Sequence, residues 1–132
     1  MPAPLPQPTE FTQPFWDAAR RHELLVPRCR HCGKCFFRPE VACTHCSSLE
    51  WDWIRASGRA TLYSYTIVSR PRTPDIAVPY VVAAVDVDEG CTMFSNIVQC
   101  RPEDVVCDMK LEVVFADLEA GLSIPQFRPI DI

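Results

Sequence analysis

The chain has 132 residues, 48% of them hydrophobic, with 13 Lys/Arg against 17 Asp/Glu. This length and apolar content fit one packed domain, or a small module fused to a compact barrel, and argue against disorder over most of the chain. No apolar run is long enough to span a membrane and the N-terminus lacks the pattern of a secretory signal, so we expect a cytoplasmic protein with no membrane partner.

The charge is divided unevenly along the chain. Residues 1–57 carry seven Lys/Arg and six Asp/Glu, a net charge of +1, whereas residues 58–132 carry six and eleven, a net charge of −5. Nonspecific nucleic-acid affinity comes mainly from clustered Lys/Arg. The acidic C-terminal half therefore argues against a nucleic-acid partner.

The N-terminal segment predicts a proline-rich lead followed by a short helix. The lead, "MPAPLPQPTEF", has four alternating prolines and is expected to be extended. In "TQPFWDAARRHELLV", residues 12–26, Thr12 is a candidate N-cap and Pro14 suits the first turn. Pro27 then stops the helix or follows a short strand.

Two Cys-x2-Cys pairs, Cys29/Cys32 and Cys43/Cys46, stand ten residues apart. A two-residue gap lets one tight turn direct both sulfurs at one point, and four thiolates form a closed tetrahedral zinc site. We expect a β-hairpin between the pairs, with residues 36–37 and 40–42 as its arms. The pattern predicts structural Zn²⁺, with a rubredoxin-type iron site as the alternative and ordinary buried thiols as the trivial interpretation.

A fifth cysteine in this cluster, Cys35, extends the pattern to Cys-x2-Cys-x2-Cys, the start of a ferredoxin motif. That motif needs a further cysteine where Pro39 stands, so we expect Cys35 to be a spare residue of the hairpin. His31 and His45 lie inside the turns and are expected to face solvent. A closed site has no open position for substrate, so the cluster is predicted to be a scaffold.

The remaining sequence predicts short β-strands separated by turns. Residues 49–54 alternate like a strand, Asp88-Glu89-Gly90 is a hairpin turn, and a helical turn begins at Pro102. The five strands predicted beyond Gly58 are 59–70, 80–87, 91–98, 111–117 and 124–130.

This pattern predicts a mainly β protein with an N-terminal helix, a rubredoxin-like zinc ribbon and a C-terminal five-stranded OB-fold barrel. An SH3-like barrel and a small sandwich are the alternatives. We divide the chain into residues 1–27 (lead and helix), 28–57 (zinc ribbon) and 58–132 (barrel).

The sequence has no recognisable catalytic motif. All three histidines, His22, His31 and His45, precede the barrel half, and there is neither a phosphate loop nor a nucleophile elbow. Three acids sit at the predicted hairpin turn, where solvated carboxylates are normal, and three cysteines are expected to be buried, inert thiols. The acids are Asp86, Asp88 and Glu89, and the cysteines are Cys91, Cys100 and Cys107. We therefore predict no catalytic residues.

Candidate contact residues come from arginines and aromatics. Arginines pair with phosphates and stack on rings, so four of them are candidate ligands for a phosphorylated small molecule: Arg38, Arg59, Arg70 and Arg72. Four aromatic residues of the ribbon are candidate contacts to the helix, the barrel or a partner: Phe36, Phe37, Trp51 and Trp53.

Several segments together resemble a known family. "PFWDAARRHELLVPRCRHCGK", "FFRPEVACTHCSS", "SGRATLYSYTIVSRP", "VPYVVAAVDVDEG" and "FRPI" occur in the order typical of zinc-ribbon/OB-fold acyl-CoA-associated proteins, long catalogued as a domain of unknown function. The resemblance covers residues 11–130. The chain departs from the family at Asp108, where glycine is common, and at Cys35, where the residue is apolar or varied.

The resemblance implies N-terminal helices, a zinc ribbon with Cys29, Cys32, Cys43 and Cys46 as ligands, and an OB-fold barrel. It also implies a hetero-oligomer with a thiolase, a lipid-transfer-type thiolase-like aldolase or a hydratase, in lipid or steroid degradation. The resemblance implies that the chain helps to bind the acyl-CoA ester or is needed for assembly and activity of the partner, without supplying catalytic residues.

Two other functions are weighed against this one. A single-stranded nucleic-acid binder would stack bases on Tyr63, Tyr65 and Phe94, but the barrel half is acidic and these aromatics alternate as strand core residues do. A rubredoxin-type electron carrier would use the same four cysteines with iron.

Overall fold

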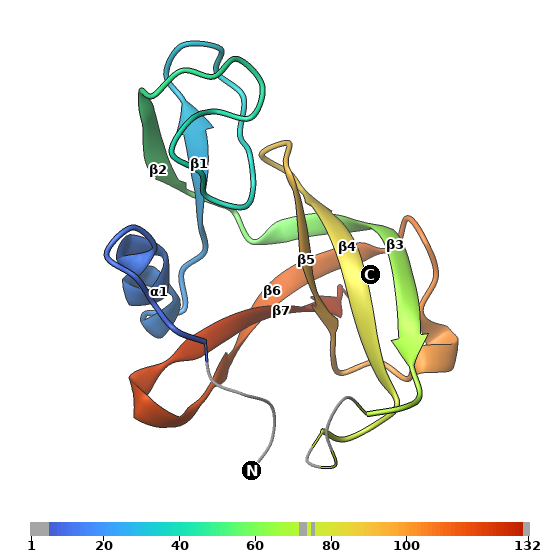
Figure 1. The fold of residues 1–132 in the computed structure, drawn as a ribbon. Helices are drawn as coiled ribbons and strands as arrows, with labels where there is room; N and C mark the ends of the chain where they lie inside the picture. The colour runs from blue at the N-terminus through green and yellow to red at the C-terminus, as the bar shows by residue number, and fades with distance from the viewer. Residues whose placement is uncertain (1–5, 72–73, 75, 131–132) are drawn as a thin grey trace.

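The computed structural model describes residues 6–71, 74 and 76–130 and contains one α-helix and seven strands, drawn in Figure 1. The elements are α1 (Gln13–Arg20), β1 (Leu25–Cys29), β2 (Trp51–Arg55), β3 (Arg59–Val68), β4 (Tyr80–Val87), β5 (Thr92–Ile97), η1 (Pro102–Asp104), β6 (Lys110–Asp117), η2 (Glu119–Gly121) and β7 (Ser123–Pro129). Within the described ranges, no helix has the length and apolarity needed to cross a membrane.

Helix α1 is shorter than the sequence predicts and ends at Arg20. Thr12 is the N-cap residue, as predicted, although its side chain makes no capping hydrogen bond. At the C-terminus the N–H of Glu23 donates to the Ala18 carbonyl and that of His22 to the Ala19 carbonyl, with His22 at φ 60°. This is the Schellman pattern, which stops a helix through a left-handed residue. Residues 24–26, which the sequence predicts to be helical, belong instead to β1 and to the connection that leads into it.

The ribbon is built on the antiparallel pair β1–β2, in which Leu25 faces Arg55 and Cys29 faces Trp51. The strand predicted at residues 49–54 is confirmed as β2. The predicted hairpin between the cysteine pairs is wrong, because residues 36–42 form bends and irregular backbone. The nearest strand-like pairing is an isolated bridge between Arg28 and Cys35, just before this segment. A metal site holds such a loop without a strand ladder, because ligation replaces the missing backbone hydrogen bonds.

The five predicted barrel strands are all present and close in the order β3–β4–β5–β7–β6, with β6 returning to β3. The pairing of β5 with β7 is parallel, and the other barrel pairs are antiparallel. This is the Greek-key order of an OB fold, not that of an open sandwich. Figure 1 shows the ribbon above one end of the barrel and α1 beside the β6–β7 hairpin.

The core of the barrel follows from alternation along its strands. Strand β4 alternates strictly between half-buried and buried residues, as a strand with one face in a core must. The interior is filled by branched and aromatic side chains that include Leu62, Val85, Leu111 and Phe127, each fully buried. A bulge between Leu62 and Ser64 interrupts this alternation on β3.

Gly58 joins the ribbon to the barrel. Its φ is +87°, and a Cβ atom there would lie 2.7 Å from Cγ1 of Val113. Its carbonyl accepts a hydrogen bond from the Val113 amide at 2.7 Å. Glycine is therefore needed at this position both for the backbone conformation and for the close approach to β6.

Candidate metal centre and adjoining cleft

Two turns of the same shape carry the cysteine pairs. The amide of Gly33 donates to the Cys29 carbonyl at 3.0 Å, and the amide of Ser47 donates to the Cys43 carbonyl at 2.9 Å. Gly33 and Ser47 both have positive φ, +75° and +67°. Each turn thus reverses the chain four residues after its first cysteine, which brings both sulfurs of the pair to one side.

The four sulfurs of Cys29, Cys32, Cys43 and Cys46 lie within 4.8 Å of one another. The Cys29–Cys46 sulfur distance is 3.5 Å and the Cys32–Cys43 distance is 3.7 Å. Tetrahedral zinc with bonds of roughly 2.3 Å separates its sulfurs by about 3.8 Å. The donor set and its spacing therefore fit a metal ion such as Zn²⁺, and all four predicted ligands are brought together.

Backbone amides support the thiolate form in these turns. The amides of His31 and Cys32 point at Sγ of Cys29, at 3.3 and 3.4 Å, and the amide of His45 points at Sγ of Cys43, at 3.3 Å. The hydrogen bond from Cys32, opposed by burial, lowers the pKa of Cys29 to about 6. Since the thiolate is the metal-binding form, these amides favour ligation.

The residues predicted to stand apart from the metal do so. Cys35 is 3% exposed and packs with the barrel core, where burial raises its pKa. His31 and His45 are exposed, and Nε2 of His45 lies 3.2 Å from the Cys35 carbonyl oxygen. With four sulfurs around one point, the site has no open position for a substrate and its role is structural.

The ribbon aromatics are largely committed to packing within the chain. Phe36 is 2% exposed and meets Trp51 edge-on at 5.6 Å, so it has no free surface and we remove it from the predicted partner contacts. Trp51 in turn contacts Trp53 at 5.2 Å and Phe11 at 5.9 Å. Phe37 is half-buried against Phe15 of α1 at 5.8 Å. These contacts tie the ribbon to α1.

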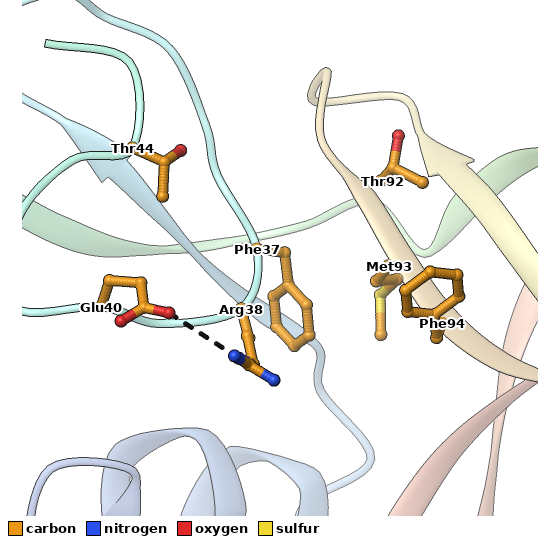
Figure 2. A pocket seen from close by; sticks show the side chains of 7 residues that line it. All are labelled: Phe37, Arg38, Glu40, Thr44, Thr92, Met93 and Phe94. Carbon is orange, nitrogen blue, oxygen red and sulfur yellow. Dashed lines mark ion pairs between the residues drawn. The ribbon is translucent and has the colours of Figure 1, made fainter.

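A cleft of about 560 Å³ lies between the ribbon loop and β5. Figure 2 shows its lining, with the ribbon residues on one side and the β5 residues on the other. They are Phe37, Arg38, Glu40 and Thr44 from the ribbon, and Thr92, Met93 and Phe94 from β5. Sequence reasoning missed this cleft, because its two walls are about fifty residues apart in the chain and no local pattern links them.

Of the candidate arginines that the structure describes, Arg38 alone lines the cleft. Its Nε pairs with Glu40 at 3.7 Å, and its side chain is 81% exposed. Arg59 begins β3 and Arg70 follows its end, roughly 35 Å apart along an extended chain. Arg59 and Arg70 thus lie at opposite ends of β3, and neither lines the cleft with Arg38. Arg72 lies outside the described residues.

Two aromatics expected in the core are on the surface. Tyr63 is 66% exposed and Phe94 is 79% exposed, which contradicts the strand-core prediction for both. Each directly follows an inward-facing residue, Tyr63 after the buried Leu62 on β3 and Phe94 after the buried Met93 on β5, so strand alternation turns both side chains outward. Tyr65 is half-buried.

Two of the three thiols outside the ribbon, Cys91 and Cys100, are poor nucleophiles, because burial favours the neutral thiol. Cys91 is buried, and desolvation raises its pKa to about 12. Burial also raises the pKa of the half-buried Cys100. Cys107 is exposed, contrary to prediction, because it lies in the turn before β6.

One polar cluster, not anticipated from sequence, links α1 to the β6–β7 hairpin. Oδ1 of Asp117 accepts from Oγ of Ser123 at 2.6 Å and lies 2.8 Å from Nε2 of His22, whose ring stacks on Phe115. The serine bond, then the histidine bond, lowers the pKa of Asp117. Both partners bind the carboxylate, so His22 and Ser123 do not form a nucleophile–base pair, and the cluster is a structural latch.

The fold and the metal centre define a zinc-ribbon/OB-fold protein. Residues 16–52 match the family described as "ChsH2, rubredoxin-like zinc ribbon domain", and residues 53–116 match "ChsH2, C-terminal OB-fold domain". A "DUF35 domain-containing scaffold protein" of Methanocaldococcus jannaschii is 35% identical over 97 residues, covering 72% of this chain and 69% of that protein. The chain belongs to this DUF35 family of ChsH2-type proteins.

Two further relatives extend the comparison. A "Probable enoyl-CoA hydratase alpha subunit" of Thermomonospora curvata is 34% identical over 116 residues, and the match spans 87% of this chain but 36% of that protein. The solved structure "Ltp2-ChsH2(DUF35) aldolase" is similar with a TM-score of 0.84 and 30% identity, over 95% of this chain and 98% of the matched chain. The fold resemblance thus extends over nearly the whole chain.

Proposed function

We propose that this chain is a non-catalytic, zinc-containing scaffold subunit that binds and supports an acyl-CoA enzyme, of the thiolase, thiolase-like aldolase or hydratase class. The observation that carries the proposal is the similarity over 98% of a chain in the Ltp2-ChsH2 aldolase structure. The relatives named as a hydratase subunit and a scaffold protein support the same role.

The chemistry of the site agrees with a supporting role. The four-sulfur centre is closed, and among residues 6–71, 74 and 76–130 no hydroxyl or thiol donates to a histidine; the hydroxyls of Thr92 and Ser123 donate to the carboxylates of Asp86 and Asp117. We therefore expect an enzyme built on this chain to take its reacting groups from another subunit. This reasoning makes a hetero-oligomer the expected state, and we propose the cytoplasm as its location.

The test is purification of the tagged chain from its native host, with the partner identified by mass. We expect one acyl-CoA enzyme subunit to co-purify in a fixed ratio and to lose activity or solubility when the chain is deleted. The isolated chain should show no thiolysis, hydration or aldol cleavage of acyl-CoA esters. Turnover by the isolated chain would reject the scaffold role.

Direct binding of the acyl-CoA ester is the finer part of the proposal. Arg38 in the cleft is the candidate contact to a CoA phosphate, because its pairing with Glu40 is long and exposed and leaves the guanidinium available. Calorimetric titration of the complex with CoA should give several-fold weaker binding for Arg38→Ala and no change for the control Arg70→Ala. Equal loss in both variants, or in neither, would remove Arg38 from the site.

A further inference from the structure

The outer face of β3, β4 and β5 carries the most exposed aromatic side chains of the barrel. In the sheet register Ser64 faces Ala84, and Ala84 faces Phe94, so these three residues lie in one row on the outer face. Tyr63 lies on the same face because it follows the inward-facing Leu62, and the β3 bulge brings Ser64 beside it. The aromatics, 66% and 79% exposed, have no covering element in the described parts of the chain.

Small residues between the two aromatics leave a hollow of about 410 Å³. Ser64 and Ala84 form part of its floor, and Tyr63 and Phe94 are part of its lining. The hollow shares Thr92 and Phe94 with the cleft beside the ribbon. One continuous surface therefore runs from the ribbon loop, over β5, to β3. From here on, the outer face means this whole surface, including the cleft.

The charges on this surface decide which kind of partner it suits. The three strands carry two charged side chains, Arg59 at the start of β3 and Asp86 near the end of β4. The adjoining cleft adds Arg38 and Glu40, which pair with each other. A single-stranded nucleic acid needs a track of cations beside its stacking aromatics, and the outer face has none. An uncharged, apolar protein surface is its electrostatic match.

We propose that the outer face is the docking surface for the acyl-CoA enzyme subunit, which inserts an uncharged apolar segment into the hollow between Tyr63 and Phe94. The inference rests on the proposed function and adds to it the side of the barrel that the partner covers. It also places the partner next to the Arg38 cleft, so that an acyl-CoA held by the partner lies within reach of that arginine. Aromatic anchors in a hollow of this kind are typical of interface hot spots.

The test measures binding of the purified enzyme subunit, identified by co-purification, to variants of the full chain loaded with zinc. Phe94→Ser and Tyr63→Ser should each raise the dissociation constant by about tenfold or more. The control Val106→Ser changes an exposed apolar residue that lines neither hollow nor cleft, and should change the constant less than twofold. The melting temperature should stay unchanged in all three variants, because each side chain points to solvent.

The possible outcomes separate the two proposals. Wild-type affinity in both aromatic variants would overturn the docking surface and leave the proposed function in place. Absence of binding by the wild-type chain to any acyl-CoA enzyme subunit would overturn both. Tight binding of an oligothymidine strand at physiological salt, lost in Phe94→Ser, would assign the outer face to nucleic acid instead.

Discussion

At the scale of single residues, the cysteine cluster shows how burial and spacing separate ligands from bystanders. Cys29, Cys32, Cys43 and Cys46 share one small volume, whereas Cys35, three residues after Cys32, turns toward the barrel core. The isolated bridge between Arg28 and Cys35 fixes this direction. The two kinds of cysteine therefore give a matched pair of variants.

Replacing Cys43 by serine should release the metal, because three thiolates cannot close the tetrahedron and the hydroxyl is a poor zinc ligand. Zinc content measured by mass spectrometry should fall from about one ion per chain to near zero, and residues 28–50 should lose order. The control Cys35→Ser should keep the full metal content. Full content in Cys43→Ser would show that the four-sulfur assignment is wrong.

Gly58 gives a second prediction at this scale. Gly58→Ala should destabilise the chain by about 2–4 kcal/mol, because the left-handed backbone costs about 1–2 kcal/mol and the new methyl collides with Val113. The control Gly90→Ala also has positive φ, but no atom lies within 4 Å of the position that its new methyl would occupy, so it should cost only the backbone strain. Urea unfolding measures the loss of stability in both variants. Equal losses would mean that β6 moves aside freely and that the contact with Val113 costs nothing.

At the scale of elements, α1 is held against the β6–β7 hairpin by a small set of polar contacts. Nε of Arg20 donates to the Gly121 carbonyl at 3.1 Å, and the Asp117 latch binds His22 and Ser123. His22 also provides the left-handed stop of the helix, so one residue both ends α1 and docks it.

The latch predicts a pH-dependent stability. Because the folded pKa of Asp117 is lowered from 3.8, its contribution to the free energy of unfolding is present at neutral pH and is lost as the pH falls through the folded pKa. Asp117→Asn should lower the urea midpoint at pH 7, and the difference from wild type should shrink toward pH 2. Glu103→Gln, an exposed carboxylate outside the latch, serves as the control and should leave the midpoint unchanged. If the difference in urea midpoint between wild type and Asp117→Asn were the same at every pH, the latch would be rejected.

At the scale of the whole molecule, the two modules are stabilised by different means. The barrel has an extended apolar core, whereas the buried cluster of the ribbon tip consists of Cys29, Phe36 and Cys43, two of them metal ligands. A tip with so small a core depends on the metal for its folding. We propose the ribbon boundary at residues 28 and 57, and the barrel at 58–132, although Cys35 and Ala56 of the ribbon pack with the barrel core.

Chelation of the metal should therefore unfold one module and spare the other. With excess chelator, hydrogen exchange should show loss of amide protection in residues 28–50 and retained protection in strands β3 to β7. Added zinc should restore the ribbon. Global unfolding on chelation, or an unchanged exchange pattern, would contradict the separate stabilisation of the ribbon tip by the metal.

By itself, the sequence determined the metal ligands, the strand β2, the five barrel strands and the order of the modules. Each depends on local spacing: two residues between ligand cysteines, and alternation along strands such as β4. Asp108, where the family often has glycine, adopts φ +71° in the turn before β6. Local patterns of this kind predict the structure correctly, because the backbone conformation that they require does not depend on distant contacts.

Only the tertiary structure decided where α1 ends, that residues 36–42 form no hairpin, and which side chains face outward. Alternation predicts two faces of a strand but not which one the barrel encloses; here Leu62 faces inward and Tyr63 outward, and the bulge after Leu62 brings Ser64 to the outer face as well. The cleft between Arg38 and Phe94 exists because zinc-ribbon and barrel segments far apart in sequence meet. Long-range closure sets these features, and no short window of residues encodes it.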